Sequence, residues 1–347
     1  MNCVSCGDMR SVTLIAAAVA VIAAAISGAA SGSAAAVRCN LWAAPYGVDT
    51  NAGTQAAPFL TLGKLAGTLV PGQTGCLPAG TSFARREVIT AVGTAAARIT
   101  ITTVPGGARA ILADGIETTQ ATRFLTLTNL AISALDNSAD RSVSGTVILR
   151  GFSTALTRSD VGPGTLKEAG RSCVVLDHAG SALIGSNVLH ECNGASPGLY
   201  AAGVLAATSV GARILDNVIF GNAGGDALAF APNAQVSVAR RNLMVDNLGG
   251  VYFGGGPKVA SRDNRIEQNV ITRTGRYDAH SGYVPNTPVG TGNLVRTNCI
   301  WSPNAVTASG AGFKLVANRK VNPRVVKGQG TYRLAASSPC RAYRPQP

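Results

Sequence analysis

Aromatic residues and long apolar segments are scarce in this sequence of 347 residues. Only 5% of the residues are aromatic although 46% are hydrophobic, so the core has to be built mainly from Val, Ile, Leu and Ala. Acidic residues are also few, with 17 Asp and Glu against 30 Lys and Arg, which gives a net charge of +13. The shortage of aromatics together with 41 glycines favours thin aliphatic layers joined by many tight turns.

A long transmembrane helix is missing from the N-terminus. The apolar stretch from Val12 to Ile26 is shorter than the roughly 20 residues that span a bilayer. Small residues follow it up to Ala36, as in a secretory signal with its cleavage site. We therefore predict that residues 1–36 are a signal peptide, with a membrane anchor as the alternative and Met1 or Met9 as the start. The mature protein is expected to be secreted or periplasmic, without an integral membrane domain, and monomeric.

After residue 36, closely spaced cysteine pairs, which would indicate a metal site, are also missing. Six cysteines remain after residue 36, and an even number in an exported chain indicates disulfides. Their proximity along the chain favours three pairs: Cys39 with Cys76, Cys173 with Cys192, and Cys299 with Cys340. No calcium-binding loop or glycine-aspartate repeat is present, so no metal ligands are assigned and calcium remains a possible cofactor.

One short sequence motif recurs through the second half of the chain. It reads SNVLHEC from Ser186, DNVIFGN from Asp216 and QNVITRT from Gln268, with a polar residue before the apolar run. That marker returns every 25 to 31 residues. The marker positions are Asn129, Asp160, Asn187, Asn217, Asn242, Asn269 and Asn298. A period of this length indicates a repeat architecture.

Each repeat unit contains two or three short runs of β-branched or alternating apolar residues, separated by Gly, Asn, Asp and Ser. This pattern is typical of strands and not of helices. The pattern therefore predicts that each unit forms one turn of a parallel β-solenoid with about three strands. Asn tolerates left-handed backbone and forms turns. Stacked turns would also align the Asn side chains in a ladder.

The repeat needs a cover at its open end. The segment from Thr61 to Leu69 has apolar residues at helical spacing, with Thr61 as the expected N-cap. A short helix here would cap the first coil. The sequence thus predicts an entry and capping segment at 37–82, the solenoid at 83–320 and a closing segment at 321–347.

Three stretches resemble secreted right-handed parallel β-helix proteins of the pectin-lyase-like superfamily. They are the entry segment from Gly53 to Thr81, the second coil from Ile99 to Gly115 and the closing segment from Gly330 to Cys340. The resemblance covers about Asn40 to Cys340. It implies an all-β, single-stranded right-handed parallel β-helix of about eight or nine coils with an N-terminal capping helix. That superfamily contains polysaccharide lyases, glycoside hydrolases, epimerases and members without known activity.

Two longer excursions, Gly162–Arg171 and Arg276–Gly292, interrupt the rhythm, and insertions in solenoids often form the binding face. The second begins with RYDAHSGY, which we interpret as a surface loop. Cleaving a uronan by elimination needs a cation, a base and a proton donor. Within eight residues this segment supplies the candidate catalytic residues Arg276, Tyr277, Asp278 and His280. It loosely resembles the Tyr, Asp and His motif of β-helix epimerases. A polar surface loop without catalytic function is the competing interpretation.

Two further histidines are weaker candidates. Asp177 and His178 are similar to an Asp-His pair of pectate lyases, but Asp177 followed by Gly180 more often marks a turn. His190 lies beside an apolar run, where a structural role is more common. Hydrolysis would need two positioned carboxylates, and the acidic residues are scattered over different phases of the repeat.

The net charge favours anionic partners. Basic residues are not interleaved with aromatics, which argues against nucleic acid. The candidate substrate-holding residues are Arg240, Arg241, Lys258 and Arg262. The sequence therefore predicts an exported protein acting on acidic polysaccharide, as a polysaccharide lyase if it is an enzyme. The alternative is a β-helix that binds glycan or cell envelope without catalysis.

Overall fold

The structure is a computed structural model that describes residues 37–134, 145–164, 171–193 and 200–346. The expected signal peptide, residues 1–36, and part of the expected excursion Gly162–Arg171 lie outside the described residues. From Arg38 onward the chain forms one compact unit, which is the subject of all that follows. No helix in the described ranges is long and apolar enough to cross a membrane.

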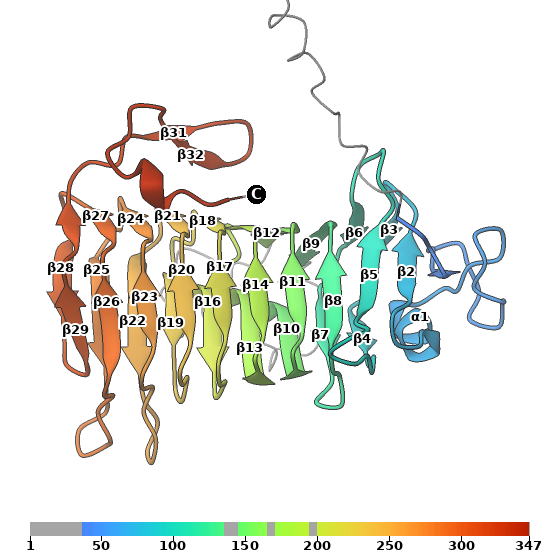
Figure 1. The fold of residues 1–347 in the computed structure, drawn as a ribbon, viewed down its shortest axis with the longest axis horizontal. Coiled ribbons are helices and arrows are strands. Elements are labelled where there is room, and N and C mark those ends of the chain that lie inside the picture. Colours follow the sequence, from blue (N-terminus) through green and yellow to red (C-terminus); the bar gives the residue numbers. More distant parts are fainter. Residues whose placement is uncertain (1–36, 135–144, 165–170, 194–199, 347) are drawn as a thin grey trace, which may run out of the picture. The chain divides into compact units, whose positions relative to one another are not determined.

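The chain winds through three parallel sheets in turn, and each strand pairs with the strand one coil earlier and one coil later (Figure 1). We call them sheets I, II and III in the order in which the chain enters them. Sheet I has 11 strands, sheet II has 10 and sheet III has 9. The predicted all-β parallel β-helix is confirmed, and the nine strands of sheet III match the expected number of coils.

Most strands are short, as Gly, Asn and Ser at every corner dictate. Sheet I consists of β1 (Leu41–Trp42), β2 (Thr74–Leu77), β5 (Ile99–Thr103), β8 (Leu125–Thr128), β11 (Ala155–Thr157), β14 (Leu183–Gly185), β17 (Arg213–Leu215), β20 (Val238–Arg240), β23 (Arg265–Glu267), β26 (Asn293–Arg296) and β29 (Phe313–Val316). Sheet II consists of β3 (Ser82–Phe83), β6 (Ala110–Leu112), β9 (Leu130–Ala134), β12 (Asp160–Gly164), β15 (Val188–His190), β18 (Val218–Phe220), β21 (Leu243–Val245), β24 (Val270–Thr272), β27 (Cys299–Trp301) and β30 (Arg319–Lys320). Sheet III consists of β4 (Glu87–Ile89), β7 (Ile116–Thr118), β10 (Gly145–Phe152), β13 (Ser172–Gly180), β16 (Ala202–Ala207), β19 (Asp226–Phe230), β22 (Gly249–Gly254), β25 (Tyr277–Gly282) and β28 (Val306–Ser309).

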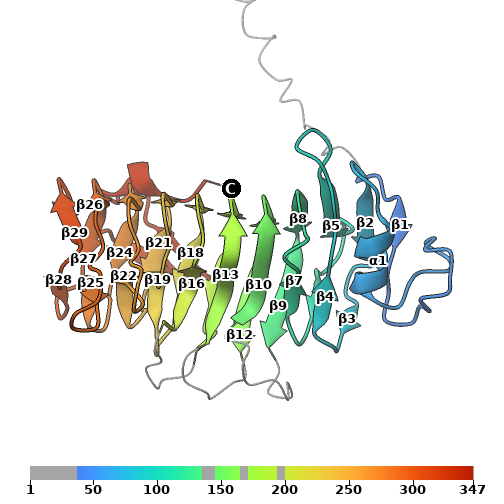
Figure 2. The same cartoon turned by 90° about the horizontal axis from the view of Figure 1, so that it is seen from below.

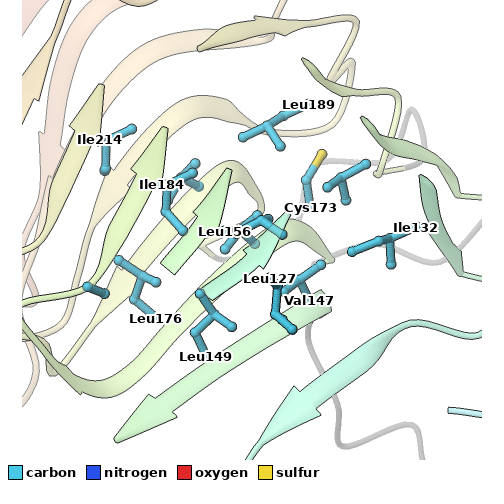
Figure 3. Packing of buried hydrophobic residues seen from close by; sticks show 14 of the residues in the cluster. Leu127, Ile132, Val147, Leu149, Leu156, Cys173, Leu176, Ile184, Leu189 and Ile214 are labelled. Atoms are coloured by element: carbon cyan, nitrogen blue, oxygen red, sulfur yellow. The ribbon is translucent and has the colours of Figure 1, made fainter. Parts of the chain in front are cut away.

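The core is a set of aliphatic rows that run from coil to coil inside the stack (Figure 3). In sheet I, one row passes through Leu127, Leu156, Ile184 and Ile214, which are paired in register and have no exposed surface. Alternate residues of a strand point to opposite faces, so each strand contributes one or two inward residues to its layer. The outward positions are thereby left free to differ between coils.

An asparagine ladder lines the corner between sheets I and II. Its members are Asn187, Asn217, Asn242, Asn269, Asn298 and Asn318, and each of the first five donates its side-chain Nδ2 to the Oδ1 of the next at 2.9 to 3.0 Å. The predicted ladder is therefore confirmed from Asn187 onward. Buried amides with all their hydrogen bonds satisfied fix the stacking register.

Two details of that prediction were wrong. In the first coils the ladder position is taken by Ser159, not Asp160, and by Leu130, not Asn129: the backbone N–H of Ser159 donates to Asn187 Oδ1, and that of Leu130 to Ser159 Oγ. The left-handed residue of each turn is the one before the ladder position, for example Asp216 with a φ of 60°. The ladder side chain is therefore selected for inward hydrogen bonding and not for turn geometry.

Helix α1 (Leu62–Thr68) covers the N-terminal end of the stack, as predicted (Figure 2). Thr61 is the N-cap, and its Oγ1 accepts a hydrogen bond from the backbone N–H of Lys64 at 3.0 Å. Leu62, Leu65 and Ala66 are buried against the first coil. The helix thus closes an aliphatic interior that would otherwise meet water.

The C-terminal residues 321–346, which we call the C-terminal strap, lie against the outer face of sheet II (Figure 1). They contain β31 (Val325–Lys327), β32 (Tyr332–Leu334) and the 3-10 helix η1 (Arg341–Tyr343). The Tyr332 ring packs edge-on against Phe220 with centroids 5.1 Å apart. The three expected disulfides are all present, and Cys299–Cys340 joins the strap to the last full coil.

Candidate active site

A cleft of about 310 Å³ lies on the outer face of sheet III, over strands β19, β22 and β25. This volume is near the lower end of the range for small-molecule sites, about 300–1,000 Å³. The polar and aromatic side chains that line the cleft are Tyr200, Asp226, Tyr252, Arg276, Tyr277, His280 and Ser281. Three of the four predicted catalytic residues therefore meet here, together with four polar or aromatic residues that were not predicted.

The segment Tyr277–Gly282 is strand β25 and not the surface loop that the sequence suggested. Ala279 pairs with Val251 inside the stack, and both are fully buried. His280 then pairs with Tyr252 on the outer face. The longer excursion of this coil follows the strand, at residues 283–292. A strand holds its outward side chains in fixed register with the neighbouring coils, which suits a preorganised site better than a loop does.

Asp226 and His280 form the centre of the cleft. His280 Nε2 lies 2.7 Å from Asp226 Oδ1, although the residues belong to coils two rungs apart. Gly249 occupies the rung between them, paired with Asp226 on one side and Tyr277 on the other. A Cβ atom at Gly249 would overlap Asp226 Oδ1. The missing side chain is thus what permits the contact.

This contact fixes the hydrogen-bonding role of each imidazole nitrogen. A carboxylate only accepts hydrogen bonds, so His280 Nε2 is the donor and carries the proton. In the neutral ring, Nδ1 then keeps its lone pair and can accept a proton. The side chains of Asp226 and His280 are 14% and 21% exposed. The pair is therefore partly shielded from water yet reachable from the cleft.

Two tyrosines hold the His280 ring. The Tyr277 ring is stacked on it with centroids 4.8 Å apart, and the Tyr252 ring is tilted against it at 5.0 Å. The Tyr252 hydroxyl donates to the Gly282 carbonyl at 3.0 Å. Burial, followed by the nearby Tyr200 and the charge of Asp226, raises the pKa of the Tyr252 hydroxyl far above its usual range. The raised pKa keeps Tyr252 in its neutral phenol form.

Tyr200 and Arg276 complete the wall of the cleft. The Tyr200 ring lies 5.8 Å from that of Tyr252, and its hydroxyl donates to the Gly255 carbonyl at 3.1 Å. The exposed Arg276 guanidinium lies 5.3 Å from the centre of the Tyr277 ring. The cleft therefore offers one cation, one carboxylate, one imidazole and three phenols to a ligand.

Asp278 does not line the cleft. Its side chain is buried, with the residue only 1% exposed, and Oδ1 accepts a hydrogen bond from Thr274 Oγ1 at 2.9 Å. Burial raises the pKa of this carboxyl, against the hydrogen bonds from Ser302 and Thr274. A loop would have exposed all four candidate side chains, but within β25 Asp278 points inward although His280, two residues later, lines the cleft. The carboxylate next to His280 is Asp226 instead.

The predicted substrate-holding residues lie elsewhere on the stack. Arg240 is on sheet I and donates to Gln268 at 2.7 Å, and Arg241 follows it in a turn, paired with Asp216 at 2.7 Å. Arg262 and Lys258 are exposed before β23. None of these four residues lines the cleft described above.

All three histidines of the chain contact an aspartate. His178 is 62% exposed beside Asp177 on β13, and His190 packs flat against Phe220 on sheet II while touching Asp160 at 3.1 Å. The pairing alone therefore does not mark a catalytic histidine. His280 is distinguished by its place in a cleft with an arginine and three tyrosines.

The described residues contain no group of three or more His, Cys, Asp or Glu side chains arranged to hold a metal ion. Within the cleft lining, Asp226 is the only carboxylate. The possible calcium requirement therefore has no ligand set among the residues that can be described.

Sequence reasoning missed Tyr200 and Tyr252 and did not connect Asp226 with His280. A signal was present, because Tyr252 and His280 are separated by one repeat, as are Asp226 and Gly249. Residues one period apart lie on adjacent rungs. An alignment of consecutive repeat units would have shown that these outward residues lie on adjacent rungs. Such an alignment requires the strand register to be known to a single residue.

No family model matches the sequence, and no curated protein matches it either. Solved structures do match the fold. XylC in complex with xylose aligns with a TM-score of 0.56 at 11% identity, covering 82% of this chain and 70% of that one. The pectate lyase Pel9A aligns with a TM-score of 0.52 at 13% identity, covering 86% and 90%. The chain therefore has the parallel β-helix fold that these proteins share.

Proposed function

We propose that the protein is an exported polysaccharide lyase that cleaves an acidic polysaccharide in the cleft on sheet III. The observation that carries this proposal is the Asp226–His280 pair, held over Gly249 and surrounded by Arg276 and three tyrosines. The fold neighbour Pel9A, itself a pectate lyase, supports the same class of chemistry. Three disulfides and a net charge of +13 support an exported protein that meets anionic polymers.

Elimination removes the proton on the carbon beside the sugar carboxylate and expels the neighbouring glycosidic oxygen. In the proposed mechanism Arg276 binds the carboxylate, which stabilises the negative charge that develops there. His280 Nδ1 takes the proton, and Asp226 stabilises the resulting imidazolium. The C–O bond then breaks as the C=C bond forms, and Tyr252 donates its proton to the leaving oxygen. Neither an oxidant nor a second substrate is needed.

Hydrolysis is less well supported by the site. Both common mechanisms of glycoside hydrolysis use two carboxyl groups about 5–10 Å apart across the scissile bond. The lining of this cleft contains Asp226 alone, and that carboxylate is already bonded to His280. An imidazole base with phenol donors fits proton abstraction better than it fits attack by water.

The decisive experiment is a screen of polygalacturonate, alginate and a glucuronan, with neutral xylan as the control substrate. A lyase produces an unsaturated uronate that absorbs in the ultraviolet, whereas a hydrolase produces only new reducing ends. We expect ultraviolet-absorbing product from at least one uronan. Reducing ends without that absorbance would refute elimination. Saturable binding without turnover would assign the cleft to the glycan-binding alternative.

The matched variants are His280→Gln and His178→Gln, since both remove a histidine from an Asp-His contact on sheet III. His280→Gln should lower kcat by about 10²- to 10⁴-fold, the usual contribution of a general base. His178→Gln should leave kcat unchanged. Equal activity of the two variants would show that this cleft is not the active site.

A further inference from the structure

Sheet I carries a regular pattern of positive charge on its outer face, away from the cleft. Each of the five consecutive strands β17, β20, β23, β26 and β29 contributes one outward cation. We call this set the cation strip. Its members are Arg213, Arg240, Arg265, Arg296 and Lys314.

The five cations alternate between two outward rows. One row runs through Arg213, Val238, Arg265, Leu294 and Lys314, and the other through Leu215, Arg240, Glu267, Arg296 and Val316. Like charges on directly adjacent strands destabilise a sheet. The alternation places an apolar or acidic residue above and below each cation, so the stack tolerates one cation on every rung.

Two of the cations already have partners on this face. Arg240 Nε donates to Gln268 Oε1 at 2.7 Å, and Arg296 is paired with Glu267 at 2.7 Å. Arg213, Arg265 and Lys314 are exposed. Five cations less one carboxylate leave the two rows with a charge of +4.

The same two rows are uncharged on the preceding strands of sheet I. Between β5 and β14 they contain Thr100, Thr126, Ala155 and Leu183 in one row, and Thr102, Thr128, Thr157 and Gly185 in the other. The fold therefore does not require charge at these positions. Solvation alone is already achieved with threonine, so the positive charge of the later strands needs another reason.

We propose that the cation strip binds an extended acidic polysaccharide, laid along the stacking direction of the coils, at a second site separate from the cleft. Parallel strands repeat every ~4.8 Å, so the five rungs present cations over roughly 19 Å. A polymer with one carboxylate on each sugar ring repeats its charge on a similar scale. Alternating rows suit a ribbon-like chain whose successive carboxylates project to alternate sides.

Nucleic acid fits this surface less well. Proteins that bind single strands combine positive charge with aromatic side chains on which bases stack. The two outward rows contain no aromatic residue from β17 to β29. The strip offers charge and aliphatic surface only, which matches a carboxylated sugar chain.

The test is a binding measurement that does not depend on catalysis. We would use the His280→Gln protein and measure its affinity for long-chain alginate and polygalacturonate by calorimetry at several salt concentrations. The test variant adds Arg213→Gln, Arg265→Gln and Lys314→Gln. The control variant instead adds Arg85→Gln, Arg123→Gln and Arg333→Gln, which removes the same charge from exposed positions outside sheet I.

We expect the test variant to bind at least one of the two polymers about tenfold more weakly than the parent, with a weaker salt dependence, because specific counter-charges are lost. The control variant should stay within about twofold of the parent, since distant charges are screened. A variant that preserves the charge, with Arg213→Lys, Arg265→Lys and Lys314→Arg, should bind like the parent. Equal weakening by test and control variants would overturn the proposal.

Two further outcomes separate this proposal from others. Tighter binding of single-stranded poly(dT) than of either uronan at the same salt concentration would overturn the assignment to polysaccharide. The lyase proposal is tested by turnover and this one by binding. A protein that binds through the cation strip but shows no lyase product would therefore refute only the lyase proposal.

Discussion

The N-terminal coils, β2 to β15, and the C-terminal coils, β16 to β30, share one interior but differ on the outside. Aliphatic rows continue through both halves without interruption. On the outer face of sheet I, threonines give way to the cation strip. On sheet III, Arg150 of the first half is paired with both Glu117 and Asp177, whereas the second half carries the cleft. The interior thus defines the scaffold, and the outward rows of the C-terminal coils carry both proposed sites.

On sheet III of the N-terminal half, Arg150 is satisfied by Glu117 and Asp177, which is typical of a solvated structural face. In the C-terminal half, the Asp226–His280 pair lines a cleft, and Arg213, Arg265 and Lys314 of the cation strip are exposed. This difference, and not the presence of Asp, His or Arg as such, separates candidate functional residues from structural ones. Four predictions test the comparison, in order of decreasing expected effect.

The largest effect is expected from the two aspartates that contact a histidine on sheet III. Asp226→Asn should lower kcat by about 10²-fold or more, since the neutral amide no longer stabilises the imidazolium. Asp177→Asn, in the N-terminal half, should leave kcat unchanged and affect only the contacts of Asp177 with Arg150 and His178. Steady-state kinetics on the uronan substrate would decide, and equal kcat values for both variants would remove the distinction between the halves.

The second prediction concerns the asparagine ladder. Asn217 is fully buried and bonded to both neighbouring ladder members, so Asn217→Ala should lower the free energy of unfolding by about 3 kcal/mol or more. Asn129 lies outside the continuous ladder and bonds only Thr103 and Arg109, so Asn129→Ala should cost about 1 kcal/mol or less. Urea unfolding measures both. Similar losses would mean that the ladder is no stronger in the C-terminal coils.

The third prediction concerns the space that glycine leaves on the outer face. Gly249→Ala should displace Asp226 from His280 and reduce kcat by about 10-fold or more, because small misplacements of catalytic groups are costly. At Gly185, in the N-terminal half, an added Cβ meets Leu183 at an ordinary 3.6 Å. Gly185→Ala should keep kcat within about twofold. Full activity of Gly249→Ala, with the fold verified by thermal unfolding, would contradict the role given to this glycine.

The smallest effect is a dependence of stability on pH in the N-terminal half. Burial lowers the pKa of His190, but the hydrogen bond and charge of Asp160 and the charge of Glu191 outweigh it and raise the pKa overall. The stabilisation is therefore complete below the unfolded pKa of about 6.5 and is lost as the pH rises through the folded pKa. We expect a loss of about 1 kcal/mol or less in the unfolding free energy.

Two variants check this assignment. His190→Gln should flatten the pH dependence of the unfolding free energy from about pH 6.5 upward, because it removes the titrating group. Arg213→Gln, in the exposed cation strip, should leave the pH dependence of unfolding unchanged. A pH dependence that survives His190→Gln would place its origin elsewhere.

The fold could be predicted from sequence because its determinants are periodic. Each repeat had to bury one aliphatic row per strand and place a polar side chain at one corner, and both signals recur along the chain. The capping helix was predictable from Thr61 and the apolar spacing after it. Even so, the ladder position shifted by one residue at Asn129 and at Asp160, where Leu130 and Ser159 replace Asn.

The site was less predictable because a shift of one residue turns a side chain from the cleft into the core. In addition, β25 departs from strict alternation: Asp278 and His280 are two residues apart and would share a face in a regular strand, yet only His280 faces the cleft. The remaining partners come from other coils, and Asp226 is 54 residues away from the histidine that it contacts. Local motif matching in one segment could not identify these partners, because only the register of the stacked strands brings them next to His280.

The C-terminal strap changes how the stack comes apart. In a solenoid held only by contacts between neighbours, the terminal coil peels away first. Here Tyr332 packs against Phe220 and donates to Asp246, and the backbone N–H of Gln346 donates to Asp216. The strap thereby connects the last coil to coils several rungs earlier. Unfolding from the C-terminal end must break all of these strap contacts together. We therefore expect the coils that carry the cleft and the cation strip to unfold as one unit while the early coils stay folded.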